Sequence, residues 1–195
     1  MEKVKIQEKL QRVLSPKRYA HTLGVMATAA SLAELHGASV EKAALAGLLH
    51  DCAREIRGEE LFHMCKEQGI PLDPVTVAQP ELLHGPLGAK LAEQEYGVAD
   101  QEVLAAIRSH TIGREGMSLL EKIVFVADYV EPGREFPGVE DIRQLTHEDM
   151  DRAMILAIDT TLGYVMRQGK LIHPQAVTAR NELVLKKLGE GSLSD

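Results

Sequence analysis

The sequence predicts an all-α fold, a helical bundle formed by a single domain. Apolar residues recur at helical rather than alternating spacing through almost the whole chain, and the breaks carry residues that start and end helices. A chain of 195 residues is long enough for one domain with a substantial core. We expect residues 1–188 to form that domain and the small, polar residues 189–195 to be disordered.

The first two long helices have recognisable start and stop signals. Ser15 followed by Pro16 is typical of an N-cap and a first helical residue, and this helix is expected to end at His36-Gly37. Ser39 is expected to cap the next helix, which runs to residues 50–51. That second helix is rich in alanine and glycine, so neighbouring helices can approach it closely.

Later helices are predicted from the same signals. Thr146, with Asp149 three residues later, is expected to cap a long helix that runs toward Gln168. The stretch 123–130 is ambiguous from its residues alone, because β-branched side chains also suit a buried strand. The other helices are expected at about residues 59–68, 85–96, 100–111, 118–130 and 174–188.

Two proline-containing segments are expected to be loops. They are Gly69 to Pro80 and the turn from Pro132 to Gly138. Both lie next to candidate site residues, so either could cover a bound substrate.

Six ionisable residues interrupt apolar helical stretches at wide intervals along the chain. A single His-Asp pair is weak evidence for a ligand pair, because a buried histidine often only donates to a carbonyl. The whole ordered set favours a common site, since nitrogen and oxygen ligands from several helices suit a divalent or trivalent metal such as iron, manganese or zinc. The six residues are His21, His50, Asp51, His84, His110 and Asp128.

Longer strings around these residues resemble a known family. The ordered ligand set is similar to that of the HD-domain metal-dependent phosphohydrolase superfamily, whose fold is a helical bundle. Within it, the strings resemble the YqeK-like symmetrical hydrolases of diadenosine tetraphosphate, over roughly Pro16 to Leu185. The strings are HTLGV from His21, AGLLHD from Ala46, LHGPLGA from Leu83 and IVFVADYVEPGR from Ile123.

The resemblance implies a metal site and a catalytic role for its neighbours. His21, His50, Asp51 and Asp128 would hold the primary metal, with iron favoured and manganese, cobalt, magnesium or zinc as alternatives. Such a metal lowers the pKa of bound water toward about 7 and polarises a phosphoryl oxygen. The catalytic set would then be Asp51 with His84 and His110, and these two histidines could instead bind a second metal.

Several residues are candidates for binding the phosphate chain. Arg54 and Arg134 can bind phosphate oxygens bidentately, and Thr111 could add a hydroxyl or backbone contact beside His84 and His110. His173 and Arg180 are weaker candidates, because they lie in a late string that also resembles a family segment. A solvated surface position would explain Arg54 equally well.

Composition restricts the partners and the compartment. The net charge of −7, with 4% aromatic residues and no tryptophan, argues against a nucleic-acid binder. The chain has no apolar run of membrane-spanning length and no signal-peptide core, and Cys52 and Cys65 do not form a metal or disulfide pattern, so we expect a cytoplasmic protein. Residues 156–162 could mark the face of a homodimer, although a stripe of core residues explains them better.

Three functions are compatible with the sequence. The resemblance implies an enzyme that hydrolyses diadenosine tetraphosphate symmetrically to two ADP by metal-activated water. A second interpretation is an HD-type phosphohydrolase that acts on another nucleotide. A third is a catalytically silent nucleotide-binding protein, which the intact set of six costly polar side chains argues against.

Overall fold

The computed structural model describes residues 3–192, which contain helices and no β-strand, so the predicted all-α class is confirmed. No helix in this range is both long and apolar enough to cross a bilayer. In chain order the elements are α1 Lys3–Val13, α2 Pro16–Leu35, α3 Val40–Leu49, α4 Gly58–Glu67, α5 Pro74–Ala78, the 3₁₀ helix η1 Pro80–Leu83, α6 His84–Tyr96, α7 Gln101–Ser109, α8 Leu119–Val130, α9 Val139–Glu148, α10 Met150–Arg167 and α11 Pro174–Ser192.

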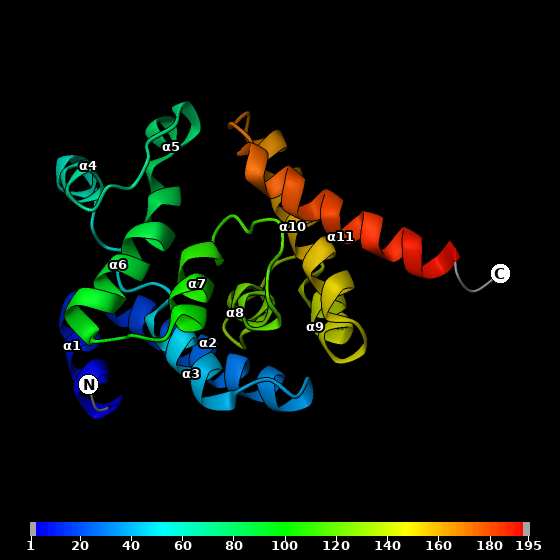
Figure 1. The fold of residues 1–195 in the computed structure, drawn as a ribbon, viewed down its shortest axis with the longest axis horizontal. Coiled ribbons are helices and arrows are strands. Elements are labelled where there is room, and N and C mark those ends of the chain that lie inside the picture. The colour runs from blue at the N-terminus through cyan, green and yellow to red at the C-terminus, as the bar shows by residue number, and fades with distance from the viewer. Residues whose placement is uncertain (1–2, 193–195) are drawn as a thin grey trace.

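Four helices form the centre of the molecule. Helix α2 packs against α3 and α8, and α7 packs against the same two helices (Figure 1). Helix α6 lies on α7, whereas α9 and α10 pack on α8 and α11 packs on α10. Five of the six predicted ligand residues therefore lie in or directly after these central helices, and His84 is the first residue of α6.

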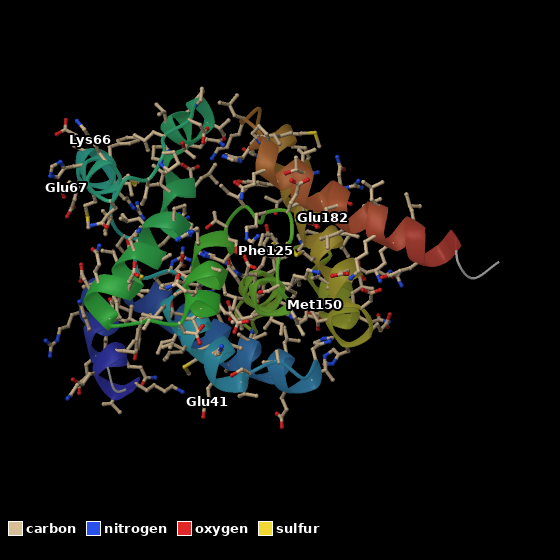
Figure 2. The ribbon with its side chains drawn as sticks, in the orientation of Figure 1. Glu41, Lys66, Glu67, Phe125, Met150 and Glu182 are labelled. Carbon is tan, nitrogen blue, oxygen red and sulfur yellow. The ribbon has the colours of Figure 1, made fainter. Side chains whose placement is uncertain are left out.

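The core is continuous through these central helices. Figure 2 shows Phe125 of α8 in the interior, where 2% of it is exposed, whereas Glu41, Lys66 and Glu67 point outward at the edge. Leu156 and Leu162, in the stretch that could have marked a dimer face, pack against this core. Burial of apolar surface contributes most of the stabilisation of such a bundle.

Helix α8 resolves the ambiguity of residues 123–130. Its start is fixed by a capping box, in which the Ser118 side chain accepts from the Glu121 backbone and the Glu121 side chain accepts from the Ser118 backbone. Because α8 contacts α2, α3, α7, α9 and α10, its three valines and Ile123 are buried by neighbours on all sides. Tertiary packing therefore outweighs the preference of β-branched residues for strands.

Two predicted caps differ from the structure. Thr146 lies inside α9, where its hydroxyl donates to the Arg143 carbonyl, so its predicted capping role is wrong and Asp149 alone caps α10. Ser15 does precede Pro16 at the start of α2, but its hydroxyl donates to Glu55 at 2.8 Å instead of capping the helix. Ser39 caps α3 as predicted, accepting from the Lys42 backbone.

Four segments are helical where the sequence predicts none. Helix α5 lies inside the predicted loop Gly69 to Pro80, because Asp73 and Thr76 form a capping box and Pro74 sits at the first helical position. Helices α1 and α9 were not among the predicted elements. Helix α11 continues to Ser192, so residues 189–192 of the predicted disordered tail are helical, and residues 193–195 lie outside the described part of the chain.

Close packing of α2 against α3 depends on Gly47. A Cβ atom added there would lie 3.0 Å from the Met26 Cα and 3.0 Å from the Val25 carbonyl oxygen, and neither backbone atom can move without separating the two helices. These helices bring His21 and the His50-Asp51 pair together. A side chain at this position would therefore disturb both packing and the site.

We predict that Gly47→Ala lowers the free energy of unfolding by about 1–3 kcal/mol, because overpacking outweighs the higher helix propensity of alanine. Urea denaturation followed by circular dichroism measures this. The matched control is Gly189→Ala in α11, where an added Cβ meets nothing within 4 Å and no loss of stability is expected. Equal stability of the two variants would contradict the packing argument.

Candidate metal centre and active site

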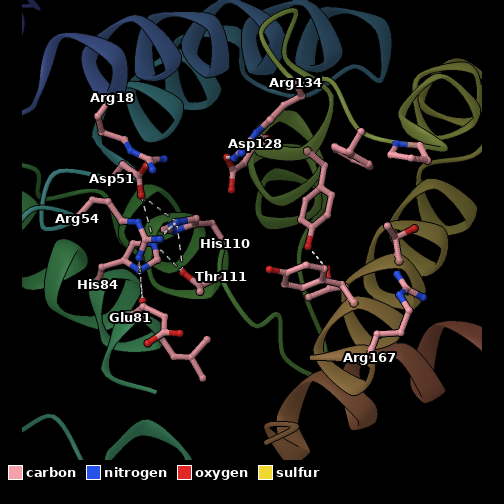
Figure 3. A pocket seen from close by; sticks show the side chains of 17 residues that line it. Arg18, Asp51, Arg54, Glu81, His84, His110, Thr111, Asp128, Arg134 and Arg167 are labelled. Carbon is pink, nitrogen blue, oxygen red and sulfur yellow. Dashed lines mark hydrogen bonds and ion pairs between the residues drawn. The ribbon is translucent and has the colours of Figure 1, made fainter. Parts of the chain in front are cut away.

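The structure brings all six predicted ionisable residues together at the ends of the central helices. His50 and Asp51 directly follow α3, His84 is the first residue of α6, and His110 directly follows α7. His21 lies in α2, and Asp128 lies in the last turn of α8. Five segments of the chain therefore supply one cluster, which lies beside a cavity (Figure 3).

The Asp51 carboxylate lies at the centre of this cluster. Its Oδ2 atom faces His50 Nε2 at 3.5 Å and His21 Nε2 at 3.9 Å. Its Oδ1 atom faces His84 Nε2 at 3.2 Å and His110 Nε2 at 3.8 Å. Each oxygen atom of the Asp51 carboxylate thus faces two histidine side chains.

Asp128 completes the first of these two groups. Its Oδ1 atom lies 2.9 Å from His21 Nε2 and 3.8 Å from His50 Nε2. The Arg134 guanidinium also pairs with this carboxylate, and its Nε donates to the Asp128 carbonyl at 2.7 Å. Arg134 therefore holds Asp128 in position as well as lining the cavity.

All four histidines are oriented by their Nδ1 atoms. His50 Nδ1 donates to the Gly47 carbonyl at 2.7 Å, and His110 Nδ1 donates to the Ile107 carbonyl at 2.7 Å. His84 Nδ1 contacts the Glu81 carbonyl, and His21 Nδ1 contacts the Glu131 carboxylate at 3.0 Å. A hydrogen on each Nδ1 leaves each Nε2 with a lone pair directed into the cluster, which is how metal-binding histidines are commonly held.

Burial and charge set the protonation of the cluster. Burial alone would raise the pKa of Asp51, but the charge of the adjacent His50 outweighs it, so the pKa of Asp51 lies well below its usual range. Burial lowers the pKa of His110 to about 3, helped by the neighbouring His50 and His84, so this imidazole is neutral at physiological pH. An ionised carboxylate and a neutral imidazole are the forms that bind a metal.

The residues present fit a bound metal. His21 Nε2 and His50 Nε2 are buried without a hydrogen-bond partner, although carboxylate oxygens lie close to both. His84 Nε2 and His110 Nε2 lie 3.0 Å apart, and two lone pairs at that distance repel unless a proton or cation lies beside them. Three overlapping groups of ligand atoms in the described residues could hold an ion: His21, His50, Asp51; His50, His110, Asp128; and Asp51, His84, His110.

The cluster opens into a cavity of about 610 Å³ that carries four arginines. Arg18 donates to Asp51 Oδ2 at 2.8 Å, and Arg134 pairs with Asp128, so both are engaged by the cluster. Arg54 donates only to the Glu81 carbonyl at 3.3 Å and lies 3.4 Å from His84 Nδ1, and Arg167 has no partner among the described residues. Two guanidinium groups are therefore available for an anionic ligand.

The wall opposite the cluster is formed mainly by α8 and α10. Tyr129 stacks on Phe125 and contacts the Thr161 hydroxyl, and Phe136 packs edge-on against Tyr129. Tyr164 lines the same cavity with 54% of its surface exposed. Exposed aromatic faces beside arginines suit a nucleotide base and its phosphates.

The predicted substrate residues divide into two sets. Arg54, Thr111 and Arg134 line the cavity, and the Thr111 hydroxyl lies 3.2 Å from His84 Nε2 and 3.3 Å from His110 Nε2. His173 pairs with Asp73 at 3.2 Å and Arg180 pairs with Asp159 at 2.8 Å. Neither His173 nor Arg180 is among the residues that line the cavity.

Four residues of this region were not predicted from the sequence. Glu131 lies in the string IVFVADYVEPGR, and its place three residues after Asp128 could have identified it. Arg18, Tyr164 and Arg167 carry no comparable signal, because only the fold brings α2 and α10 to opposite sides of the cavity. Phe136 belongs to the predicted turn 132–138, which does border the cavity.

Comparisons with known proteins agree with this geometry. The model of the HD domain family matches residues 18–133. A protein of Bacillus subtilis named symmetrical bis(5'-nucleosyl)-tetraphosphatase is 42% identical over 90% of this chain and 94% of its own length. A protein of Halalkalibacterium halodurans with the same name is 41% identical over 89% of this chain and 92% of its own length.

A solved structure shares the fold. The crystal structure of a predicted HD superfamily hydrolase involved in NAD metabolism, from Clostridium acetobutylicum, superposes with a TM-score of 0.93. It is 42% identical in sequence and covers 95% of this chain and 98% of its own. The arrangement of helices around the cluster is therefore shared with a protein solved by crystallography.

We predict that Glu131→Gln lowers metal affinity about 10–100-fold, as is usual when a group that orients a metal ligand is removed. The two carboxylate oxygens accept from His21 Nδ1 and from the Gly133 backbone at 2.7 Å, whereas an amide offers only one acceptor to these two donors. Competition with a chelator measures the affinity. The control is Glu135→Gln on the exposed turn, which should bind metal like the wild type; equal affinity in both variants would contradict this role of Glu131.

Proposed function

The chain belongs to the HD domain family, and from this premise we propose that it hydrolyses diadenosine tetraphosphate symmetrically to two ADP. The observation that carries the proposal is the cluster of histidines and aspartates at one side of a cavity with four arginines. The names of the Bacillus and Halalkalibacterium relatives, each aligned over about nine-tenths of this chain, support this substrate.

The metal-dependent chemistry of the HD fold requires a bound divalent metal, for which His21, His50, Asp51 and Asp128 form the first proposed site. Such an ion polarises a phosphoryl oxygen and activates a water molecule. Mixed imidazole and carboxylate ligands suit iron, manganese and zinc alike, and we propose iron because the resemblance to the YqeK-like hydrolases favours it. The chain supplies two imidazoles and two carboxylates, and contacts with Gly47, Glu131 and Arg134 already orient three of these four side chains.

A second ion is proposed between Asp51 Oδ1, His84 and His110. The Nε2 atoms of His84 and His110 lie 3.0 Å apart, and both lack a proton if each Nδ1 donates to its carbonyl. The Thr111 hydroxyl contacts both nitrogens but has a single hydrogen, so it can donate to only one of their two lone pairs. A cation satisfies both nitrogens at once. Asp51 would then be shared by both sites through its two oxygens.

The arginines bind the phosphate chain in this proposal. The chain carries a net charge of −7, so a polyphosphate is repelled by the protein as a whole and must be attracted locally. Arg54 and Arg167 are not paired with carboxylates among the described residues, so binding a phosphate does not require them to break an ion pair. Tyr164 offers a face on which an adenine can stack.

Two other functions remain as alternatives. The Clostridium protein is described as a hydrolase involved in NAD metabolism, which favours testing other nucleotides as substrates of the same site. A silent nucleotide-binding protein would not need the buried, uncompensated Nε2 atoms of His21 and His50, which cost free energy in the absence of an ion. We propose a cytoplasmic enzyme, in keeping with its two buried free cysteines, and one that does not bind nucleic acid.

The reaction is tested by its first products. Purified metal-loaded protein incubated with diadenosine tetraphosphate should release ADP as the only initial product, because the scissile bond is the central one of the four-phosphate chain. Ion-exchange chromatography of early time points identifies the products. Equal amounts of AMP and ATP would contradict symmetrical cleavage. If the protein left diadenosine tetraphosphate intact but hydrolysed another nucleotide, the alternative substrate would be favoured.

The two proposed sites are tested by counting ions. We predict two metal ions per wild-type chain, one in His110→Ala and none in Asp51→Ala, since Asp51 is the residue that the two proposed sites share. Elemental analysis gives the count, and circular dichroism checks that the helices persist. His110→Ala is also expected to lower the rate by about two to three orders of magnitude, as when one electrostatic group is removed from other active sites.

One ion in the wild type and one in His110→Ala would contradict the second site. In that case His84 and His110 would contact the phosphates directly. Full metal occupancy in Asp51→Ala would contradict both sites.

A further inference from the structure

A second cavity adjoins the first and shares three side chains with it. It has a volume of about 420 Å³, and Arg54, Glu81 and His84 line both cavities. Figure 3 shows these three residues together at one end of the first cavity, near Asp51 and His110, with Arg167 at the other end. The candidate metal cluster therefore lies close to the boundary between two cavities and not at the middle of one.

This position matters for a substrate that is symmetrical about its reacting bond. In the proposed reaction the central bridge of the phosphate chain is cleaved, so one ADP half lies on each side of the cluster. The first cavity extends from the cluster in one direction, toward α10. The other ADP half of the bound substrate must then extend in the opposite direction, past Arg54 and His84, where the second cavity begins.

The lining of the second cavity suits a nucleotide. Arg57 has 77% of its side chain exposed and only a 3.4 Å contact with Glu55, and Arg54 has no carboxylate within ion-pair distance among the described residues. Ile56, Leu61 and Pro80 add an apolar surface for a base or ribose. Both volumes lie within the range of roughly 300–1,000 Å³ that is usual for ligand sites.

One acidic side chain lines the second cavity as well. Glu81 is paired with Lys170 at 3.3 Å, which offsets its charge, and its carbonyl oxygen already accepts from Arg54. The net positive charge of the second cavity is therefore set by Arg54, at the boundary with the first cavity, and by Arg57. Guanidinium groups in that arrangement can bind the phosphate chain as it passes from one cavity to the other.

We propose that the second cavity, lined by Arg54, Ile56, Arg57, Leu61 and Pro80, binds the second ADP half of the dinucleotide. The inference rests on the proposed function and adds to it the location of each half. The first cavity, with Tyr129, Phe136 and Tyr164, offers aromatic faces to its base, whereas the second offers only aliphatic ones. The two halves of one symmetrical molecule are thus held by different surfaces.

Arg57 provides the test, because it lines only the second cavity and contacts none of the candidate metal ligands. Arg57→Glu is expected to raise the KM for diadenosine tetraphosphate about tenfold or more, since it places a carboxylate beside the phosphate chain. Arg57→Lys keeps the charge but loses the planar guanidinium, so it should raise the KM less than Arg57→Glu does. Arg12→Glu on α1 makes the same change in net charge away from both cavities and should leave the KM unchanged.

Binding of the product gives a second readout that does not depend on turnover. Calorimetric titration of the metal-loaded protein with ADP should give two ADP per chain for the wild type and for Arg12→Glu, and one for Arg57→Glu. One ADP per wild-type chain, two ADP per chain of Arg57→Glu, or a KM of Arg57→Glu equal to that of Arg12→Glu would overturn the inference. Absence of ADP from the reaction products would instead contradict the proposed function itself.

Discussion

The structure depends on the burial of one charged side chain, Asp51, at the junction of four helices. Only 2% of Asp51 is exposed, and an isolated carboxylate in such a place would cost several kcal/mol. Imidazole nitrogens surround both of its oxygens, and Arg18 donates to Oδ2 at 2.8 Å. A bound cation would offset the remaining cost, so folding of the central helices and assembly of the candidate metal site are energetically coupled.

The same coupling gives a reason for two glycines near the candidate metal site, Gly24 and Gly85. A Cβ at Gly24 would lie 2.5 Å from Glu131 Oε2, and a Cβ at Gly85 would lie 2.8 Å from the Arg108 carbonyl and 2.9 Å from the Thr111 hydroxyl. Each glycine makes room for a group that orients or borders a candidate ligand. The close approach of the helices is therefore a condition for the ligand atoms of different segments to lie within 4.8 Å of one another.

The sequence predicts the polar cluster well because its signal is local. Histidine or aspartate in an apolar helical stretch is conspicuous at each position, and the fold only has to bring the stretches together. Arg167 and Tyr164 give no such signal, since an arginine and a tyrosine at the end of a long helix resemble ordinary surface residues. Thr146 shows the opposite error, because its spacing from Asp149 suggests a cap, but the preceding helix α9 continues through it.

The four arginines of the first cavity differ in whether a carboxylate of the protein already pairs with them, and this difference bears on which anions the cavity can bind. Arg18 and Arg134 are held by the carboxylates of the cluster, where they offset negative charge that the apolar surroundings cannot stabilise. Arg54 and Arg167 lack such partners among the described residues and stand at opposite ends of the first cavity. An extended anionic ligand that contacts both arginines gains two new ion pairs without breaking old ones, whereas a short anion at one end of the cavity contacts only the arginine there. The division between paired and unpaired arginines thus favours an extended polyphosphate over a short anion, despite the overall negative charge of the chain.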